Sequence, residues 1–166
     1  MTKHKTGTRK ESQTQTPSDV SMKTKTPFTG GCLCGAVRYE CTAEPMRMLE
    51  CHCADCQHFT GGAGMSGVIV PAKAVFVVKG APRFYSAPSS AGGNIHRGFC
   101  SDCGSPVLAK FDRAPHVYSI PAGSLDDPSW FQPQVYMWTS DAQPWHQMDP
   151  AVPKFPEYPP FTANPK

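Results

Sequence analysis

The stretch GGCLCGAVRYEC, residues 30–41, contains the two features that set the fold of this chain. Its first half holds a Cys-x-Cys pair, Cys32 and Cys34, followed directly by Gly35. Two thiols at this spacing form one edge of a tetrahedral metal site, and glycine lets the chain reverse so that backbone N–H groups point at the sulfur atoms. Residues 36–41 then alternate between apolar and polar, which predicts a strand with one buried face. We therefore expect a metal-supported turn that leads into a β-strand.

Five of the remaining cysteines stand in two further groups. Cys51-His52-Cys53-Ala54-Asp55-Cys56 places three thiols within six residues, and Cys100-Ser101-Asp102-Cys103 forms a second pair that is again followed by glycine. Only Cys41 stands alone, and we expect it to be an ordinary buried thiol on a strand.

The spacing of these groups leaves three ways to use the thiols. Two pairs together would close one structural zinc site, and the triplet would leave a fourth position open, as catalytic zinc sites do. The alternative is a single four-thiol site that borrows from the triplet and leaves the other cysteines free. Disulfides are the third interpretation, since eight is an even number, but neighbouring thiols in a Cys-x-Cys pair are poorly placed to bridge each other.

The rest of the chain has the pattern of short strands broken by turns. The 18 prolines and 14 glycines interrupt nearly every gap between apolar runs, which favours an all-β or β-rich fold over long helices. We expect strands at 36–41, 65–70, 75–78, 83–86, 94–99, 107–111, 116–120 and 134–139, with one short helix at 54–60.

Composition divides the chain into a leader, one domain and a tail. Residues 1–26 are rich in Thr, Lys and Ser and almost free of large apolar side chains, so we expect a disordered basic leader. Residues 27–152 then form a single zinc domain. Residues 153–166 are proline-rich, and we expect no regular element there.

The distribution of charge argues against several classes of partner. Residues 1–26 carry six Lys or Arg residues and two acidic residues, which is a net charge of +4. Because the whole chain has a net charge of +3, the remaining residues have a net charge of −1. A nearly neutral domain gives no indication of a nucleic-acid surface. The leader has no apolar run and no stretch approaches a membrane span, which predicts a cytoplasmic protein. A reducing compartment favours metal ligation over disulfides.

Together these motifs resemble the glutathione-dependent formaldehyde-activating enzyme family, which also includes centromere protein V. The resemblance rests on five blocks in the family's order over roughly residues 27–150: GGCLCGAVRYE at 30–40, CHCADC at 51–56, RGFCSDCG at 97–104, GSLDDP at 123–128 and Pro144-Trp145.

The resemblance implies a β-rich fold similar to Mss4 and two zinc ions per chain. By the family pattern, the structural zinc is held by Cys32, Cys34, Cys100 and Cys103, and the catalytic zinc by Cys51, Cys53 and Cys56. The implied activity joins glutathione and formaldehyde into S-(hydroxymethyl)glutathione, a carbon–sulfur lyase reaction run in reverse. The chain departs from the family at Gln57-His58, where a basic residue is typical, and at Tyr136, where a histidine often stands.

Other side chains are candidates for the remaining chemistry. His58, two residues past Cys56, is the best local proton donor to the developing alkoxide. Arginines suit the carboxylates of glutathione, so Arg97 and Arg113 are candidates for substrate binding; Arg38 is a further one. His52 stands between two ligands and should project away from them, as a solvent-facing or backbone-bonded imidazole. The rival function is a zinc-stabilised binding module without turnover, and a third keeps the chemistry on another thiol or carbonyl.

Overall fold

The computed structural model describes residues 26–160, so most of the expected leader, 1–26, and the last residues of the tail, 161–166, lie outside the described part. The strands are β1 (Phe28–Gly31), β2 (Arg38–Cys41), β3 (Arg47–Cys51), β4 (Met65–Pro71), β5 (Val75–Lys79), β6 (Arg83–Pro88), β7 (Asn94–Phe99), β8 (Pro106–Phe111), β9 (Val117–Pro121), β10 (Tyr136–Met137) and β11 (Lys154–Phe155). The helices are α1 (Ala54–Thr60) and three single 3₁₀ turns, Ala72–Ala74, Ala122–Ser124 and Thr139–Asp141.

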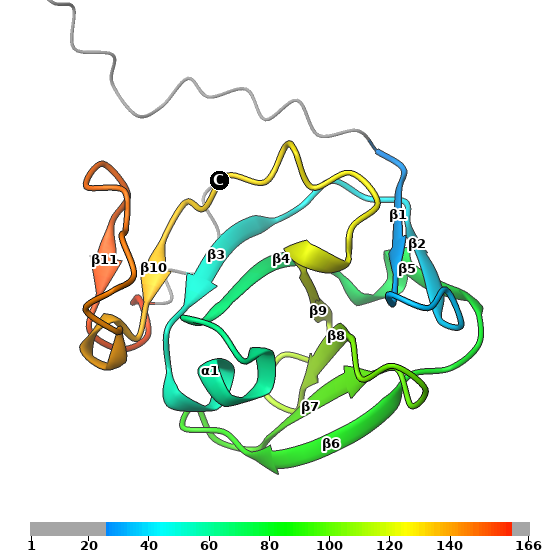
Figure 1. The fold of residues 1–166 in the computed structure, drawn as a ribbon, viewed down its shortest axis with the longest axis horizontal. Helices are drawn as coiled ribbons and strands as arrows, with labels where there is room; N and C mark the ends of the chain where they lie inside the picture. The colour runs from blue at the N-terminus through cyan, green and yellow to red at the C-terminus, as the bar shows by residue number, and fades with distance from the viewer. Residues whose placement is uncertain (1–25, 161–166) are drawn as a thin grey trace, which may run out of the picture.

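These strands form two sheets. One has three strands in the order β1-β2-β5, and the other has eight in the order β11-β10-β3-β4-β9-β8-β7-β6. Figure 1 shows β1, β2 and β5 on one side of the molecule and β10 and β11 on the opposite side. Nearly all pairings are antiparallel; β10 pairs in parallel with β3 and β11. The β-rich prediction is confirmed, and the architecture is consistent with an Mss4-like fold.

The core lies between the two sheets and takes its apolar side chains from alternating strand positions. Val37, Tyr39 and Cys41 are 3%, 1% and 0% exposed, which confirms the predicted buried face of residues 36–41 and the buried Cys41 thiol. The Tyr39 hydroxyl lies 2.8 Å from Ser124 Oγ, so the one polar atom of this large buried ring has a partner. Burial raises the pKa of the Cys41 thiol, as expected for a thiol that serves packing.

Three strands escaped the sequence prediction. β1 contains two glycines and β3 has no period-two alternation, so neither has a strand-like pattern. The expectation of no regular element in 153–166 was wrong, because Lys154–Phe155 forms β11 against β10. Prolines 153 and 156 flank this two-residue strand rather than occupy it, which leaves both N–H groups in place.

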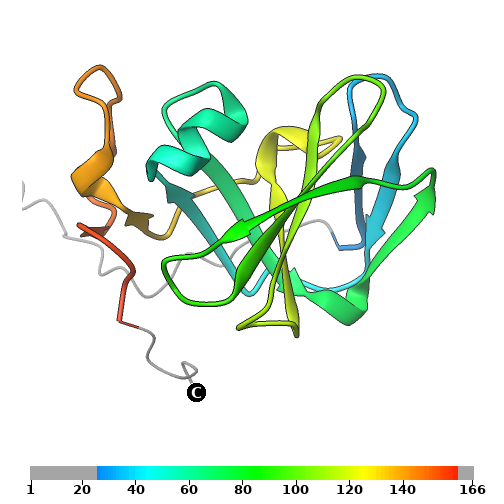
Figure 2. The same ribbon diagram turned by 90° about the horizontal axis from the view of Figure 1, so that it is seen from below.

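The strand β3 is an interior strand, and this positions the residues that follow it. It pairs with β4 on one side and with β10 on the other, where Glu50 N–H donates to Val135 O and His52 N–H to Met137 O at 3.0 and 2.9 Å. The chain then enters α1. Figure 2 shows the C-terminal segment that carries β10 and β11 beside α1.

Candidate functional site

The thiols of Cys32, Cys34, Cys100 and Cys103 form the four-thiol cluster, in which all Sγ atoms lie within 4.8 Å of one another. The Sγ–Sγ distances are 3.5 Å for Cys32–Cys34 and 3.7 Å for Cys34–Cys100. A tetrahedron with metal–sulfur bonds of about 2.3 Å has edges of about 3.8 Å, so these distances fit a zinc ion.

Two hairpin turns build the four-thiol cluster in the same way. Cys32 and Cys34 lie in the turn between β1 and β2, and Cys100 and Cys103 in the turn between β7 and β8. Each turn ends in a glycine with positive φ, Gly35 at 73° and Gly104 at 76°, a conformation that other residues rarely adopt. The first turn belongs to the three-stranded sheet and the second to the eight-stranded sheet, so a metal here would join the two sheets.

Hydrogen bonds to sulfur support this cluster as a holder of negative charge. The Val37 N–H donates to Cys32 Sγ at 3.2 Å, and Ser105 Oγ lies 3.3 Å from Cys103 Sγ. The Ser105 contacts lower the pKa of Cys103 to about 6. Thiolates stabilised in this way are ready ligands for zinc.

The thiols of Cys51, Cys53 and Cys56 form the three-thiol cluster at the junction of β3 and α1, also within 4.8 Å of one another. Cys51 Sγ lies 3.5 Å from Cys53 Sγ, and Cys51 and Cys56 are buried. Hydrogen bonds from the Cys51 and Cys56 thiols lower the pKa of Cys53 to about 2, while the reciprocal contacts raise that of Cys51. The cluster therefore favours one thiolate in the absence of a cation, and a divalent cation would favour more.

The disulfide interpretation is wrong for this chain. All eight cysteines lie within residues 26–160, and each is a free thiol. The structure brings together the same seven residues that the family pattern groups, as one set of four and one set of three. Soft thiolate donors at tetrahedral spacing fit zinc at both clusters, with three protein ligands at the second.

A cavity of about 580 Å³ opens between these regions. Its walls include Cys32, Arg38 and Asp126 on one side and Thr60, Met65 and Ser66 on the other. Met65 pairs with Cys51 across the sheet and packs in the same apolar cluster as Cys56, so the cavity wall adjoins the three-thiol cluster. The volume lies within the usual range of small-molecule sites.

Arg38 is the arginine that lines this cavity. Its guanidinium donates to Asp126, which also accepts from Thr29 Oγ1 at 2.5 Å. These two hydrogen bonds lower the pKa of Asp126. The next carboxylate, Asp127, accepts from Ser129 N–H at 3.1 Å, so this segment forms an Asx turn.

The three residues predicted for catalysis and substrate binding lie elsewhere. His58 is exposed in the last turn of α1, the helix that carries Cys56. Arg97 is 6% exposed, and its Nη2 donates to Asp55 Oδ2 at 3.0 Å. Arg113 is exposed in the turn between β8 and β9, and its side chain lies next to Gly92 of the neighbouring turn between β6 and β7. None of the three is among the residues that line the cavity, and their roles stay predictions.

Around α1, residues outside the predicted site form a connected polar network. Gln57 Nε2 donates to His52 O at 2.6 Å and to Asp141 O at 2.9 Å, and its Oε1 accepts from Gln143 at 2.9 Å. Tyr136 is buried and its hydroxyl accepts from Asp149 N–H at 3.2 Å. Gln57 and Tyr136, which stand where the chain departs from the family pattern, thus anchor the C-terminal segment.

His52 is 1% exposed and its Nδ1 lies 3.1 Å from Ala63 O, so the backbone-bonded expectation is confirmed and the solvent-facing one is wrong. Its ring groups with Glu50 and His146, two residues that the sequence reasoning did not select. Glu50 precedes Cys51 on one strand, so strand alternation could have indicated that Glu50 lies on the same face as His52. Nothing in the sequence links His146 to Glu50.

Large aromatic rings are typical of cores and pocket walls, and two of the three tryptophans conform. Trp130 packs on the core and Trp138 is partly buried, whereas Trp145 is 66% exposed.

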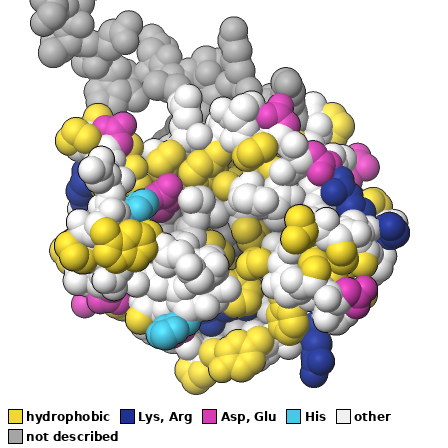
Figure 3. Space-filling view, viewed as in Figure 1, with side chains coloured by type: hydrophobic (Ala, Val, Ile, Leu, Met, Phe, Trp, Pro, Cys, Tyr) yellow, Lys and Arg dark blue, Asp and Glu magenta, His cyan; other side chains and the backbone are white. Residues whose placement is uncertain are grey.

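On the face shown in Figure 3, the described Lys and Arg side chains are interspersed with Asp and Glu and form no broad basic area. Within residues 26–160, no helix is both long and apolar enough to cross a membrane.

Comparison with known proteins identifies the family. The family model for the glutathione-dependent formaldehyde-activating enzyme matches residues 27–141, well over half of the chain. The crystal structure of a Rhodobacter sphaeroides protein from the Northeast Structural Genomics programme is similar at 22% sequence identity and a TM-score of 0.48, covering 59% of this chain and 87% of that one. The matched segment includes both thiol clusters and every cysteine. The chain therefore belongs to the glutathione-dependent formaldehyde-activating enzyme family.

Proposed function

We propose that the protein catalyses the reversible addition of glutathione to formaldehyde at the three-thiol cluster. The observation that carries the proposal is the division of seven thiols into a set of four and a set of three, because only the set of three leaves a tetrahedral position free. In the reaction the glutathione sulfur forms a bond to the formaldehyde carbon, the C=O double bond becomes a single bond, and the thiol proton ends on the new hydroxyl. No electrons are gained or lost.

The two clusters would hold zinc through Cys32, Cys34, Cys100 and Cys103 and through Cys51, Cys53 and Cys56. Bound at the three-thiol cluster, zinc would supply positive charge that lowers the pKa of an approaching thiol. Three thiolates around one ion give a net charge of about −1, which suits thiol binding better than water activation.

The protein's own residues supply charge and protons around the cluster. Arg97, held by Asp55, contributes to the low pKa of Cys53 and places a buried positive charge near the thiolates. We propose that His58, which is exposed on the same helix as Cys56, donates the proton that forms the product hydroxyl.

The substrate carboxylates need cationic partners. Arg97 and Arg113 remain our sequence-based assignment, and Arg38 is the arginine favoured by the cavity. Variants Arg97→Met, Arg113→Met and Arg38→Met separate these assignments. A higher KM for glutathione only in the Arg38 variant would move substrate binding to the cavity, and a rise in the other two would support the original pair.

Exchange spectroscopy on a glutathione–formaldehyde mixture tests the function. Catalytic amounts of the zinc-loaded full chain should accelerate interconversion with the adduct, and Cys53→Ser should remove the acceleration. Cys41→Ala, which removes a buried thiol that belongs to neither thiol cluster, is the control and should keep it. An unchanged exchange rate with intact protein would favour a binding module without turnover. Acceleration with another thiol alone would change the substrate. We further propose a cytoplasmic location, because thiols grouped for metal binding are typical of a reducing compartment.

A further inference from the structure

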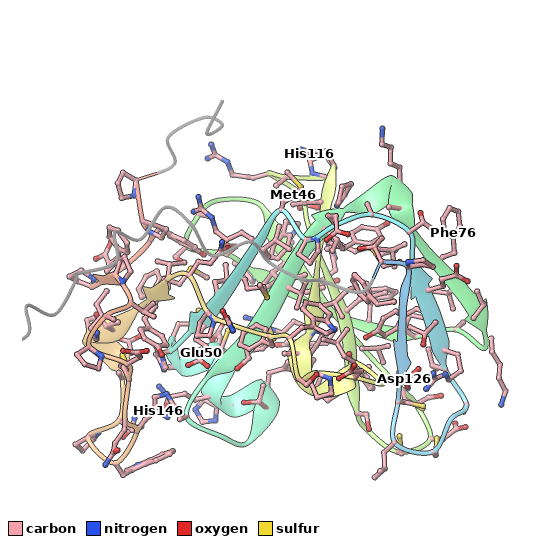
Figure 4. The ribbon with its side chains drawn as sticks, turned by 90° about the horizontal axis from the view of Figure 1, so that it is seen from above. Met46, Glu50, Phe76, His116, Asp126 and His146 are labelled. Atoms are coloured by element: carbon pink, nitrogen blue, oxygen red, sulfur yellow. The ribbon has the colours of Figure 1, made fainter. Side chains whose placement is uncertain are left out.

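Behind the three-thiol cluster lies a second kind of donor set, formed by Glu50, His52 and His146. One ligand atom from each lies within 4.8 Å of the others. Glu50 Oε2 is 3.4 Å from His146 Nε2 and 3.9 Å from His52 Nε2, and the two imidazole rings are 4.9 Å apart between centroids. Figure 4 shows Glu50 and His146 on the same side of the molecule.

Strand geometry separates this set from the thiols. Successive side chains on an extended chain point to opposite faces, so Cys51 and Cys53 face one way and Glu50 and His52 the other. The third residue, His146, comes from the C-terminal segment, beyond the residues 27–141 that match the family model. The set is therefore distinct from both thiol clusters.

The hydrogen bonds around the set direct lone pairs into it. Because a carbonyl only accepts, His52 Nδ1 donates its proton to Ala63 O, and in the neutral imidazole Nε2 then keeps its lone pair. Ser66 Oγ donates to Glu50 Oε1 at 3.2 Å, which leaves Oε2 for the centre. Outer contacts of this kind orient the ligands of metal sites.

Two nitrogen atoms in the centre are buried without a hydrogen bond. Among the described residues, neither His52 Nε2 nor His146 Nε2 has a hydrogen-bond partner, and both lie within ion-pair distance of Glu50 Oε2. Buried nitrogen lone pairs that face a carboxylate oxygen are costly unless a proton or a metal cation lies between them. Zinc bonds of about 2.1 Å to nitrogen and oxygen give a tetrahedral edge of about 3.4 Å, close to the distances seen.

The C-terminal segment is also fixed before any ion binds. Gln143, whose carbonyl accepts from His146 N–H at 3.0 Å, is tied to Gln57 on α1, and Tyr136 holds Asp149. His146 thus reaches the centre from a loop that is anchored at both ends.

We propose that Glu50, His52 and His146 bind a third divalent transition-metal ion of the zinc class, which fastens the C-terminal segment to β3. Two imidazoles and one carboxylate suit zinc, cobalt or iron(II) and are a poor set for calcium or magnesium. This proposal is independent of the proposed activity, because its readout is metal stoichiometry.

The test titrates the full chain, loaded with two equivalents of zinc, with Co²⁺. One further equivalent should bind and give weak visible ligand-field bands without sulfur-to-cobalt charge transfer. His146→Ala and Glu50→Gln should lose this equivalent, and Ser66→Ala should weaken the affinity for it about tenfold. The control is His116→Ala, at an exposed histidine on another edge of the molecule in Figure 4, which should keep the third equivalent.

Two results would overturn the proposal. The wild-type chain would bind no third equivalent if the centre is only an imidazolium–carboxylate pair. Equal binding by the wild type and by both ligand variants would place the ion elsewhere. The two zinc ions at the thiol clusters report whether each variant is folded, and the Glu50→Gln substitution keeps the side-chain shape.

Discussion

The two thiol clusters differ in how much of the chain they join. The four-thiol cluster brings together hairpin turns 66 residues apart in sequence, from Cys34 to Cys100, and from different sheets. The three-thiol cluster spans six residues at the junction of β3 and α1, where strand pairing and the contacts of Gln57 already hold the chain. A metal at the first cluster closes a long loop, whereas a metal at the second closes a short one. We therefore expect a metal ion at the four-thiol cluster to be required for folding and a metal ion at the three-thiol cluster to be dispensable for it.

The largest effect is expected at the four-thiol cluster. Cys103→Ser should abolish cooperative unfolding, because structural zinc contributes about 10–16 kcal/mol and a domain has only about 5–15 kcal/mol to lose. Circular dichroism melts with zinc analysis measure this. Cys41→Ala, which costs only about 1–2 kcal/mol, is the matched control. A folded Cys103→Ser protein with normal stability would erase the contrast between the clusters.

A smaller effect on folding is expected at the three-thiol cluster. Cys53→Ser should keep the free energy of unfolding within about 1–2 kcal/mol of the wild type, because β3 and α1 have other supports. The variant should carry one zinc fewer at the thiol clusters and show only the uncatalysed exchange rate. Unfolding as severe as that of Cys103→Ser would mean that the two roles are assigned wrongly.

The hydrogen bonds of Gln57 should stabilise the junction of β3 and α1, at the three-thiol cluster, independently of a metal ion. Gln57→Ala removes three hydrogen bonds between α1, His52 and the C-terminal segment, and we expect a loss of about 1–3 kcal/mol in urea unfolding. Gln132→Ala, at a side chain away from this network, should change it little. Equal stability of the two variants would show that the thiols alone hold the helix.

The smallest effect concerns pH near the four-thiol cluster. Arg38 and Thr29 lower the pKa of Asp126, so the ionised carboxylate stabilises the fold above the unfolded-state pKa, and this stability is lost as the pH falls through the lower folded-state value. Asp126→Asn should remove that part of the acid dependence below about pH 4. The difference should be under about 1 kcal/mol, since the pair is partly exposed. Parallel pH–stability curves for variant and wild type would contradict it.

Local patterns predicted much of this molecule. The helix Ala54–Thr60 and the strand Asn94–Phe99 appear with the expected bounds, because both have clear periodicity or end signals. The grouping of seven thiols came from the family pattern, since spacing alone left the pairing open. Nothing local indicates β11, whose partner is a distant strand, or His146, which reaches Glu50 only through tertiary packing. For the same reason nothing local predicts the exposure of Trp145, because a large apolar ring does not by itself say whether a loop will cover it.

The position of β3 inside its sheet has a consequence for metal affinity. Because its backbone is hydrogen-bonded on both edges, the spacing of the side chains at its end is fixed whether or not an ion is present. An incoming ion need not order the strand, so its binding energy is available for selectivity among metals instead of for conformational ordering. The end of this strand therefore acts as a preorganised support, with sulfur donors on one side and nitrogen and oxygen donors on the other.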